Sequence, residues 1–441
     1  MFIPSDFDVP VLGKRSVKSP LNLSNIEGDG IYDYITDEDR VLHDASLKNF
    51  LHCRDKNQVP ISFEKAGPRE YLFFDPAKSK AAIVTCGGLC PGLNDVIRSI
   101  VLTLWYRYNV KNIIGIKYGY EGFIPQYNHP VVEFTPDVVE GIHLNGGTIL
   151  GSSRGPQSVE KIVDALQSMN VNMLFTIGGD GTLRGARDIQ EEIESRGLKI
   201  AVGGIPKTID NDIDLIERSF GFETAFSIAN DVIRYAHNEA AGAYNGIALI
   251  KLMGREAGFI AANAALSIQE VNFVLVPEMK FDIHGENGFL NLLKQRLEAR
   301  HHALIVVAEG AGQHLFKETG NETDASGNVK LEDIGIYLKN VINENFKSQN
   351  FPFSLKYIDP SYIIRSAPAI PNDSKFCSLL AKNAVHAAMS GKTGFVVGNW
   401  NNEFTLLPIP VAVKKRKRID IESELWYNVL EATGQTNMQH R

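Results

Sequence analysis

The sequence predicts an α/β protein with two doubly wound, Rossmann-like lobes, a cleft between them and an N-terminal extension. Short apolar runs, such as residues 81–85 and 173–177, lead into Gly-Gly pairs. A helical segment near 94–108 follows the first run, and a second set of apolar runs comes later in the chain. Apolar strands that end at glycines and lead into helices are typical of parallel sheets covered by helices on both faces.

These elements divide the chain into four parts. Residues 1–75 are turn-rich and are expected to form an N-terminal embellishment. A first lobe spans 76–215, a second spans 216–375, and 376–441 is expected to pack back on both lobes. Strands are expected first at 81–85, 113–116, 173–177 and 200–205, and then at 246–252, 273–276, 304–309 and 393–397. Ligands of such sheets bind at the carboxyl ends of the strands, where the glycines fall.

The composition indicates a globular protein that binds neither nucleic acid nor membranes. The 441 residues are 44% hydrophobic and 22% charged, with a formal net charge of -7. The chain starts without the basic and apolar regions of a signal peptide, and no apolar stretch reaches the roughly 20 residues of a membrane span. Cys86 and Cys90 have a ligand-like spacing, but no second pair completes a zinc site. We therefore expect a reduced, cytoplasmic protein.

Two glycine-rich turns follow predicted strands. The turn at 85–94 joins a strand to a helix, where backbone N–H groups and the helix dipole can receive phosphate oxygens. It matches neither a Walker A sequence nor G-x-G-x-x-G. The turn at 178–182 reads Gly-Gly-Asp-Gly-Thr, and its carboxylate can reach Mg²⁺ while the backbone stays close to a polyphosphate. An ordinary turn with Asp180 as a helix N-cap explains this second turn equally well.

A third turn, at 204–212, reads Gly-Ile-Pro-Lys-Thr-Ile-Asp-Asn-Asp after an apolar strand. Asp210 and Asp212 are two residues apart, so in an extended segment their carboxylates point to the same side. One can act as a base toward a substrate hydroxyl while the other helps to hold a metal ion or orients a partner. A structural loop rarely places Lys, Thr, Asp, Asn and Asp in a row, so a functional site is favoured.

Two arginines complete the candidate site. Arg255 follows a predicted strand within Leu-Met-Gly-Arg, where a guanidinium can stabilise developing phosphoryl charge. A surface arginine beside a packing methionine is the alternative. Arg365 lies between Pro360 and Pro368, in a rigid loop suited to holding an anion.

Together these motifs resemble the phosphofructokinase family over about residues 81–433, most of the chain. The match is closest to longer members that carry an N-terminal extension, Pro-Lys-Thr-Ile-Asp-Asn-Asp and Tyr-Ile-Asp-Pro-Ser-Tyr-Ile-Ile-Arg. The resemblance implies transfer of the γ-phosphoryl group of MgATP to O1 of fructose 6-phosphate, a step of glycolysis. It also implies that lobe 76–215 binds the nucleotide and lobe 216–375 the sugar phosphate.

The resemblance assigns roles residue by residue. Asp210 takes the proton from the 1-hydroxyl of the sugar, and Asp180 and Asp212 hold Mg²⁺. Arg154 and Arg255 stabilise charge on the transferring group. The residues implied at the nucleotide phosphates are Gly87, Arg154, Gly179, Asp180, Gly181 and Thr182. The residues implied at the sugar phosphate are Thr208, Ile209, Asp210, Met253, Gly254, Arg255, Glu309, Lys356, Tyr362 and Arg365.

The chain departs from the family at the 6-phosphate pocket. Family members complete this pocket with two arginines from a neighbouring subunit, and here Lys356 and Gly246 align with them. Lys356 can supply charge but not a planar fork. A substrate site shared between subunits implies a homo-oligomer, either a dimer or a tetramer. The effector site of short bacterial members is matched only at Arg98, so their allosteric regulation is not expected to carry over.

The phosphoryl donor depends on two positions. Pyrophosphate-using relatives typically carry Asp where this chain has Gly181 and Lys where it has Lys207, whereas short bacterial ATP users carry Gly at both. An Asp at 181 would place negative charge near the nucleotide α-phosphate, at a cost on the order of several kcal/mol, and Gly181 removes that obstacle. Lys207 is long and can swing aside. ATP is therefore the expected donor.

The motifs leave three alternatives to an ATP-dependent phosphofructokinase. A pyrophosphate-dependent enzyme would use the same site with the other donor. A catalytically silent regulatory subunit should have lost its base or its arginines, but Asp210, Asp212, Arg154 and Arg255 are all present. Lipid and NAD kinases share Gly-Gly-Asp-Gly-Thr but are not expected to carry Pro-Lys-Thr-Ile-Asp-Asn-Asp together with Met-Gly-Arg.

Overall fold

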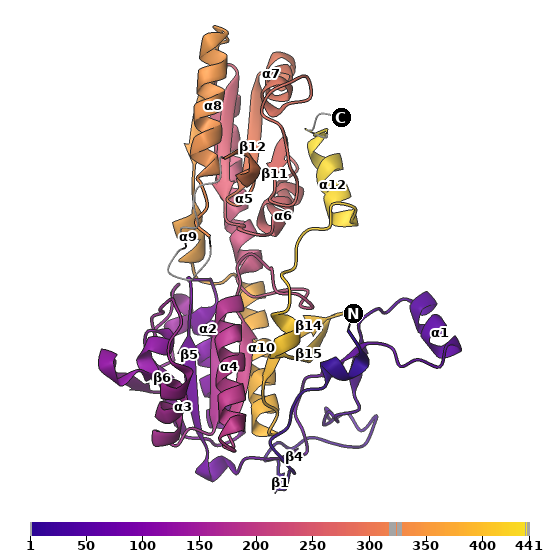
Figure 1. Ribbon diagram of the computed structural model, residues 1–441, viewed down its shortest axis with the longest axis vertical. Coiled ribbons are helices and arrows are strands. Elements are labelled where there is room, and N and C mark those ends of the chain that lie inside the picture. Colours follow the sequence, from indigo (N-terminus) through magenta and orange to yellow (C-terminus); the bar gives the residue numbers. More distant parts are fainter. Residues whose placement is uncertain (1, 317–322, 324–328, 437, 439–441) are drawn as a thin grey trace. The chain divides into compact units, whose positions relative to one another are not determined.

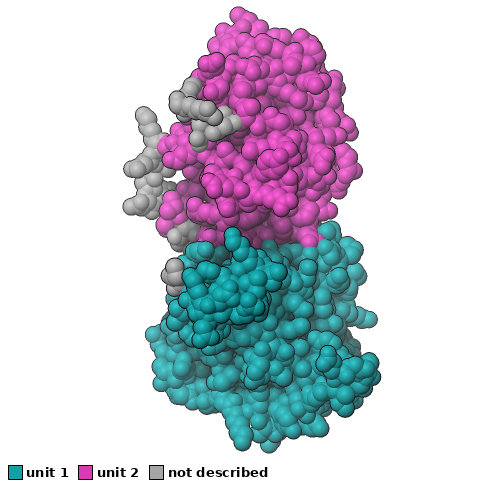
Figure 2. All heavy atoms as spheres, turned by 90° about the vertical axis from the view of Figure 1, so that its right-hand side faces the viewer, with its two compact units in different colours: residues 1–208, 213–221, 367–415 teal, residues 209–212, 222–366, 416–441 magenta. Residues whose placement is uncertain are grey.

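The chain forms two compact units, which Figure 2 shows in different colours. The computed structural model describes residues 2–316, 323, 329–436 and 438. Unit 1 consists of 1–208, 213–221 and 367–415, and unit 2 of 209–212, 222–366 and 416–441. The chain thus passes repeatedly from one unit to the other, and the short segment with both predicted carboxylates belongs to unit 2.

Within the described residues, unit 1 is built on a nine-stranded sheet in the order β2-β3-β15-β14-β9-β8-β5-β6-β7. The strands from β14 to β6 are parallel, and those outside them run antiparallel to their neighbours. The strands are β2 (Arg40–Leu42), β3 (Ser62–Lys65), β5 (Lys80–Thr85), β6 (Asn112–Ile116), β7 (Val131–Glu133), β8 (Met173–Gly178), β9 (Ala201–Pro206), β14 (Phe395–Trp400) and β15 (Glu403–Pro408). A separate ribbon pairs β1 (Val17–Lys18) with β4 (Tyr71–Leu72).

Helices cover both faces of this sheet because successive strand residues point to opposite sides. Ala82, Val84 and Leu174 belong to one apolar cluster with the inner faces of α3 and α4. The helices α2 and α10 pack against each other (Figure 1). The unit 1 helices are α1 (Leu47–Asp55), α2 (Leu93–Leu102), α3 (Val159–Ser168), α4 (Asp180–Ser195), α10 (Pro371–Met389) and α11 (Ile409–Ala412).

The N-terminal residues are built into unit 1. Strands β2 and β3 extend the sheet beyond β15, and Phe7 and Phe63 are buried in the same cluster as α3 and α4. A buried ion network adds to this attachment: Glu64 accepts from Arg69 Nη2 at 2.8 Å and from Lys392 Nζ at 2.8 Å. Buried charges need such pairing, because an unpaired one would carry a large desolvation cost.

Unit 2 contains, in the described part of the chain, a four-stranded parallel sheet in the order β11-β12-β10-β13. One face packs against α5, α6 and α12, and the other against α7 and α8. The strands are β10 (Gly246–Leu252), β11 (Phe273–Leu275), β12 (His302–Ala308) and β13 (Ser354–Ile358). The helices are α5 (Phe222–Ala241), α6 (Phe259–Ile268), α7 (Phe289–Arg300), α8 (Ile334–Ser348), α9 (Ser361–Arg365) and α12 (Glu424–Thr433).

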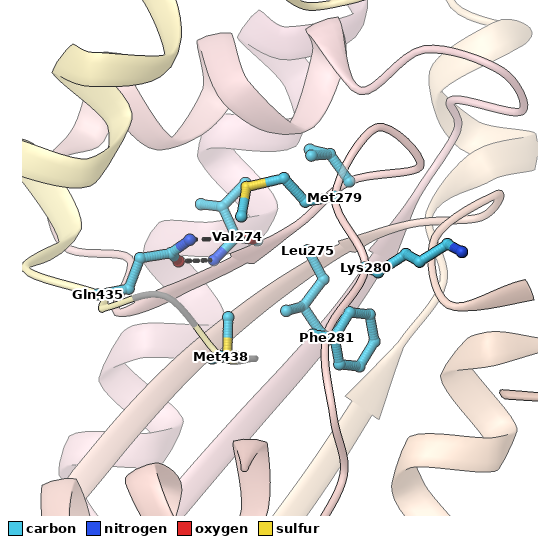
Figure 3. Close-up of a pocket in the computed structure, with 8 residues that line it drawn as sticks. Val274, Leu275, Met279, Lys280, Phe281, Gln435 and Met438 are labelled. Carbon is cyan, nitrogen blue, oxygen red and sulfur yellow. Dashed lines mark hydrogen bonds between the residues drawn. The ribbon is translucent and has the colours of Figure 1, made fainter. Parts of the chain in front are cut away.

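The C-terminal tail protects the exposed edge of β11. The side chain of Gln435 accepts from the N–H of Val274 at 2.7 Å and donates to its carbonyl at 3.3 Å, as a neighbouring strand would (Figure 3). Met438 is buried in the cluster that contains α7 and α8. Together with apolar residues at 274–281, the tail lines a small pocket. An edge covered in this way is closed to pairing with other chains.

The predicted strands are confirmed, with end shifts of up to three residues. One placement is corrected: the strand predicted at 393–397 among the second set is β14, which pairs with β9 in unit 1. Among the described residues, no helix is long and apolar enough to cross a membrane.

Candidate active site

Within unit 1, three predicted turns lie at the carboxyl ends of adjacent strands. Strand β8 lies between β5 and β9, and the three are parallel, so the turns that follow them share one edge of the sheet. The register of β8 and β9 brings their ends to the same level, because Gly178 lies opposite Pro206. The predicted nucleotide-binding residues and the donor-specificity residue Lys207 are therefore brought together by the order of the strands.

The turn after β5 depends on glycine at its centre. Gly87 has φ +83°, in the left-handed region that glycine adopts without strain. Its N–H donates to the carbonyl of Ser153 at 3.1 Å, and its carbonyl accepts from the hydroxyl of Ser152 at 2.5 Å. These bonds hold the segment with Arg154 beside the turn. The guanidinium is exposed, and a Cβ on Gly88 would lie 3.5 Å from its Nη2.

The turn after β8 leads directly into α4. Gly179 is the N-cap and Asp180 the first helical residue, so the alternative in which Asp180 caps the helix is wrong. The Asp180 carboxylate instead pairs with Arg184 Nε at 3.0 Å, one turn further on. The backbone N–H groups at the start of α4 lie at this end of the sheet, which is the arrangement that binds phosphate oxygens.

Gly178 and Gly181, in the turn after β8, differ in the space around them. A Cβ on Gly178 would lie 2.1 Å from Oγ1 of Thr182, so packing alone requires glycine. Gly181 is exposed, and apart from its chain neighbours and the backbone of its own helix no described atom lies within 4 Å of the place where its Cβ would be. The fold therefore leaves open space at Gly181, the position where an Asp is predicted to obstruct the nucleotide.

Lys207 is held inside the site. It is 6% exposed, its Nζ donates to the carbonyl of Gly88, and a Cβ on Gly87 would lie 3.2 Å from Nζ. The backbone N–H of Lys207 donates to the carbonyl of Gly178 at 2.9 Å. Through its side chain and its backbone, Lys207 thus links the turn after β5 to the end of β8. Burial and the carbonyl of Gly88 thus hold the ammonium of Lys207 in the turn, and whether it moves aside for a nucleotide stays a prediction.

In unit 2 the predicted residues gather at the carboxyl ends of β10, β12 and β13. Met253, Gly254 and Arg255 follow β10, and Glu309 follows β12. The N–H of Glu309 donates to the carbonyl of Leu252 at 2.9 Å, so the two strand ends stay bonded beyond the sheet. Gly310 makes this approach possible, since a Cβ there would lie 1.8 Å from the carbonyl oxygen of Arg255.

Asp210 faces these strand ends. Its Oδ2 accepts from the N–H of Arg255 at 3.4 Å, and its buried Oδ1 has no hydrogen-bond partner among the described residues. Burial, together with the negative charges of Asp212 and Glu309, raises the pKa of Asp210 well above that of an ordinary carboxyl group. A carboxylate with an unused oxygen and high proton affinity has the properties of a general base.

Glu309 shares this environment. Burial raises the pKa of Glu309, while the positive charges of Arg255 and Lys251 act in the opposite direction. Two carboxyl groups whose charges repel each other within one site are characteristic of functional positions, where they are retained despite their cost to stability.

Arg416, which the sequence motifs did not single out, lies beside Asp212 and Glu256. Its Nη1 is 4.0 Å from Asp212 Oδ2 and 3.8 Å from Glu256 Oε1. The next residue, Lys417, donates its N–H to the carbonyl of Asp212 at 2.8 Å. Arg416 belongs to a run of five basic residues at 414–418. Nothing local in that run signals that it returns to a segment some 200 residues earlier, so only the fold reveals it.

The residues predicted to bind the 6-phosphate do not all lie at the carboxyl end of the unit 2 sheet. Arg365 lies on α9, just beyond β13, with its guanidinium carbon 4.3 Å from the ring centre of Tyr362. Tyr362 is 75% exposed. Lys356 is exposed in the middle of β13, opposite Ala248. Asn245, beside Gly246, is buried at the other end of β10 and donates to the carbonyl of Pro352 at 2.9 Å.

The remaining predicted residues contribute backbone or packing. Met253 is buried, and Ile209 packs against the same apolar cluster. The carbonyl of Thr208 accepts from the hydroxyl of Ser219. All four cysteines are free, and the described residues contain no group of three or more carboxylate, imidazole or thiol side chains arranged to hold a metal.

Comparison with known proteins agrees with this geometry. The family model for phosphofructokinase matches residues 80–388. The chain is 50% identical over 436 residues to a protein of Borreliella burgdorferi named ATP-dependent 6-phosphofructokinase, covering 98% of this chain and 97% of that protein. It is 46% identical over 409 residues to a protein of the same name from Amycolatopsis methanolica, covering 91% and 89%.

A solved structure shares the fold. The pyrophosphate-dependent phosphofructokinase of Marinobacter aquaeolei superposes with a TM-score of 0.66 at 19% identity, covering 81% of this chain and 92% of that one. At this identity the likeness concerns the fold alone. From the family match and the two close relatives, the chain belongs to the phosphofructokinase family.

Proposed function

We propose that this chain is an ATP-dependent 6-phosphofructokinase, which makes fructose 1,6-bisphosphate and ADP from fructose 6-phosphate and ATP. The observation that carries the proposal is the environment of Asp210, a buried carboxyl group with one unused oxygen beside the Met-Gly-Arg turn. The names of the relatives at 46–50% identity support the same activity.

The proposed reaction is an in-line transfer without a covalent enzyme intermediate. Oδ1 of Asp210 accepts the proton of the 1-hydroxyl as the bond from O1 to the γ-phosphorus forms. The bond from the γ-phosphorus to the β–γ bridging oxygen breaks, and ADP leaves with that electron pair. Arg154 and Arg255 are assigned to the charge that develops on the transferring group.

The residues fit a magnesium ion. Asp180 and Asp212 supply the hard carboxylate oxygens that Mg²⁺ prefers, and Mg²⁺ is usually held by one or two carboxylates together with substrate phosphates and water. Bound there, the ion would neutralise phosphate charge and orient the β- and γ-phosphates. Asp180 and Asp212 would hold it, and their other contacts would keep the carboxylates in place.

The proposed sugar site uses residues of unit 2. Glu309 is assigned to the sugar hydroxyls, Arg365 to the 6-phosphate, and the 253–255 turn to the rest of the sugar. Tyr362 and Thr208 are assigned supporting contacts. Lys356 lies in the middle of β13, and Asn245 is buried at the far end of β10. We propose that a neighbouring subunit completes the anion pocket around Arg365. The proposal therefore includes a homo-oligomer, and the cytoplasmic location predicted from the sequence stays part of it.

The donor assignment rests on Gly181, and one observation favours pyrophosphate. The open space at Gly181 leaves room for the α-phosphate of a nucleotide. Lys207, however, is held in the glycine turn, where its ammonium would attract any polyphosphate and would not have to move for a short one. Pyrophosphate is therefore the second candidate donor.

A direct assay separates these possibilities. Formation of fructose 1,6-bisphosphate from fructose 6-phosphate and Mg²⁺ is measured with ATP and with pyrophosphate as separate donors. Activity with ATP alone supports the proposal, and activity with pyrophosphate alone overturns the donor assignment while keeping the site. Absence of activity with both donors would favour a silent regulatory subunit.

A further inference from the structure

Lys251 is a charged residue on an inner strand of the unit 2 sheet. Strand β10 lies between β12 and β13, and its other six residues are apolar and buried. Alternation places Lys251 on the same face as Ile247 and Leu249, which pack against α7 and α8. Only 12% of its side chain is exposed. An ammonium in such a place is retained only if it is well paired, because burial of an unpaired charge is very costly.

Two carboxylates pair with this ammonium, and each also starts a helix. Lys251 Nζ is 2.7 Å from Asp333 Oδ2 and 3.1 Å from Asp359 Oδ2. The other oxygen of Asp333 accepts from the N–H of Ile336 at 3.0 Å, at the start of α8. The other oxygen of Asp359 accepts from the N–H of Ser361 at 3.1 Å, at the start of α9. One ammonium thus links β10 to the first turns of two helices.

The shifts in pKa of Lys251 and Asp359 favour the charged form of both residues. Burial acts to lower the pKa of Lys251, but the hydrogen bonds to Asp333 and Asp359 outweigh it and raise that pKa. Burial acts to raise the pKa of Asp359, but Ser361 and Lys251 lower it. The links therefore persist throughout the neutral pH range.

The segments that Lys251 joins are those that carry the proposed sugar site. Strand β10 continues into the turn with Arg255, and α9 carries Arg365. The guanidinium of Arg255 donates to the carbonyl of Val329, in the segment that leads to Asp333. Burial raises the pKa of Glu309, and the positive charges of Arg255, Lys251 and Arg365 act against this rise.

We propose that Lys251 is a positioning residue for the sugar-phosphate half of the site, an inference that rests on the proposed function. It holds Asp359, and through Asp359 the start of α9, against the strand that presents Arg255. A five-residue helix does not form alone in water, so the direction in which Arg365 projects depends on this anchor. Lys251 itself need not touch the substrate.

The test is Lys251→Met, which keeps most of the apolar stem and removes the ammonium. We expect the KM for fructose 6-phosphate to rise about 10–100-fold, the scale on which outer contacts that orient a binding group act. The KM for ATP should stay within about twofold, because those contacts lie in the other unit. Lys251→Arg should recover most of the loss, since its planar fork can meet both carboxylates.

The matched control is Lys294→Met, on α7 of the same unit. Lys294 Nζ donates to Gln349 Oε1 at 2.8 Å, away from the strand ends. This variant should have both KM values of the unmodified chain. If Lys251→Met does not fold, Asp359→Asn removes one of the two contacts and should raise the same KM. Adding Asp359→Asn to Lys251→Met should change the KM little further, because Lys251→Met has already broken the pair with Asp359.

The outcomes distinguish this inference from the proposed function. An active unmodified enzyme whose Lys251→Met variant keeps its KM for fructose 6-phosphate overturns the positioning role alone. Equal rises in both KM values, or full additivity with Asp359→Asn, would also overturn it. An unmodified chain without activity toward either donor removes the proposed function and this inference with it.

Discussion

Asp210 combines two demands that oppose each other. Its burial, with Asp212 and Glu309 nearby, favours the protonated form, whereas a base must be ionised to accept a proton. Because its pKa is raised in the folded protein, the folded chain binds this proton more tightly than the unfolded chain. The stability that Asp210 contributes is therefore full below the pKa of the unfolded state and is lost as pH rises through the raised pKa.

Asp210→Asn should separate activity from stability. We expect kcat to fall by about 10²–10⁴-fold, the usual contribution of a positioned base. The melting temperature should rise relative to the unmodified chain, by an amount that grows between pH 5 and pH 9, since each unit of pKa shift corresponds to about 1.4 kcal/mol. Scanning calorimetry across this range measures the difference. A variant that keeps its turnover would refute the role of Asp210.

The pH dependence of the unmodified enzyme follows from the same shift. For free enzyme, kcat/KM for fructose 6-phosphate should fall as pH decreases through the raised pKa of Asp210, which is at higher pH than for an ordinary carboxyl group. Steady-state rates from pH 5 to pH 9 at saturating donor check this. An acid limb at the ordinary carboxyl pKa, near 4, would contradict it.

Gly181→Asp tests donor choice at a position where the fold has room. Because no described atom apart from its chain neighbours and the backbone of its own helix lies within 4 Å of the added Cβ, the variant should fold normally. We expect kcat/KM for ATP to fall by about two orders of magnitude or more, since like-charge contacts cost several kcal/mol. Gly181→Asn, similar in size but uncharged, is the control. Equal losses in the two variants would mean that bulk, not charge, excludes ATP.

At the scale of elements, the strand order builds each half of the site. The sequence was sufficient for the strands that end in glycine turns, because buried parallel strands appear as continuous apolar runs. It was also sufficient to place Asp210, Gly179 and Glu309 at strand ends. It did not reveal β13, which is half-exposed, or β15, which is antiparallel to its neighbours. It also did not reveal that Arg416 lies beside Asp212. Those features depend on contacts between distant segments, which a local pattern does not encode.

The start of α4 offers a matched pair of alanine variants. Gly178→Ala places a Cβ 2.1 Å from Thr182 Oγ1, so the first turn of α4 must shift. It should lower the melting temperature and raise the KM for ATP at least tenfold, a typical cost of misplacing binding groups. Gly181 lies in the first turn of α4, where a Cβ meets no clash, so Gly181→Ala should be stabilised by about 0.5–1 kcal/mol. Thermal melts and ATP titrations of both variants compare the two effects. Equal destabilisation would contradict this view of the turn.

At the scale of the whole molecule, neither unit is a continuous stretch of chain. Unit 1 receives β14 and α10 from residues 367–415, and unit 2 receives α12 from 416–441. Trp426 on α12 is 2% exposed in the cluster that contains α5 and α6. Each unit therefore closes its core with residues that lie far along the chain from most of its strands.

Ending the chain after Lys415 should damage the units unequally. All segments of unit 1 lie before that point, whereas unit 2 loses Trp426, the cover of β11 and Arg416. We expect protease cleavage to concentrate at 222–366, with fragments of unit 1 surviving. Limited proteolysis with mass spectrometry, with the full chain as control, maps the cuts. Equal resistance in both units would show that α12 is dispensable for unit 2.

The route of the chain also sets when the protein can be finished during synthesis. Chains emerge from the ribosome at about 5–20 residues per second. The parallel strands β5, β8 and β9 are made long before α10 and β14, which cover and extend them, and β10 long before α12. Nascent chains must therefore keep apolar strands from pairing wrongly for roughly ten seconds or more at that rate. We consequently expect the nascent chain to need chaperones that hold unfolded segments, whereas the folded enzyme does not need them.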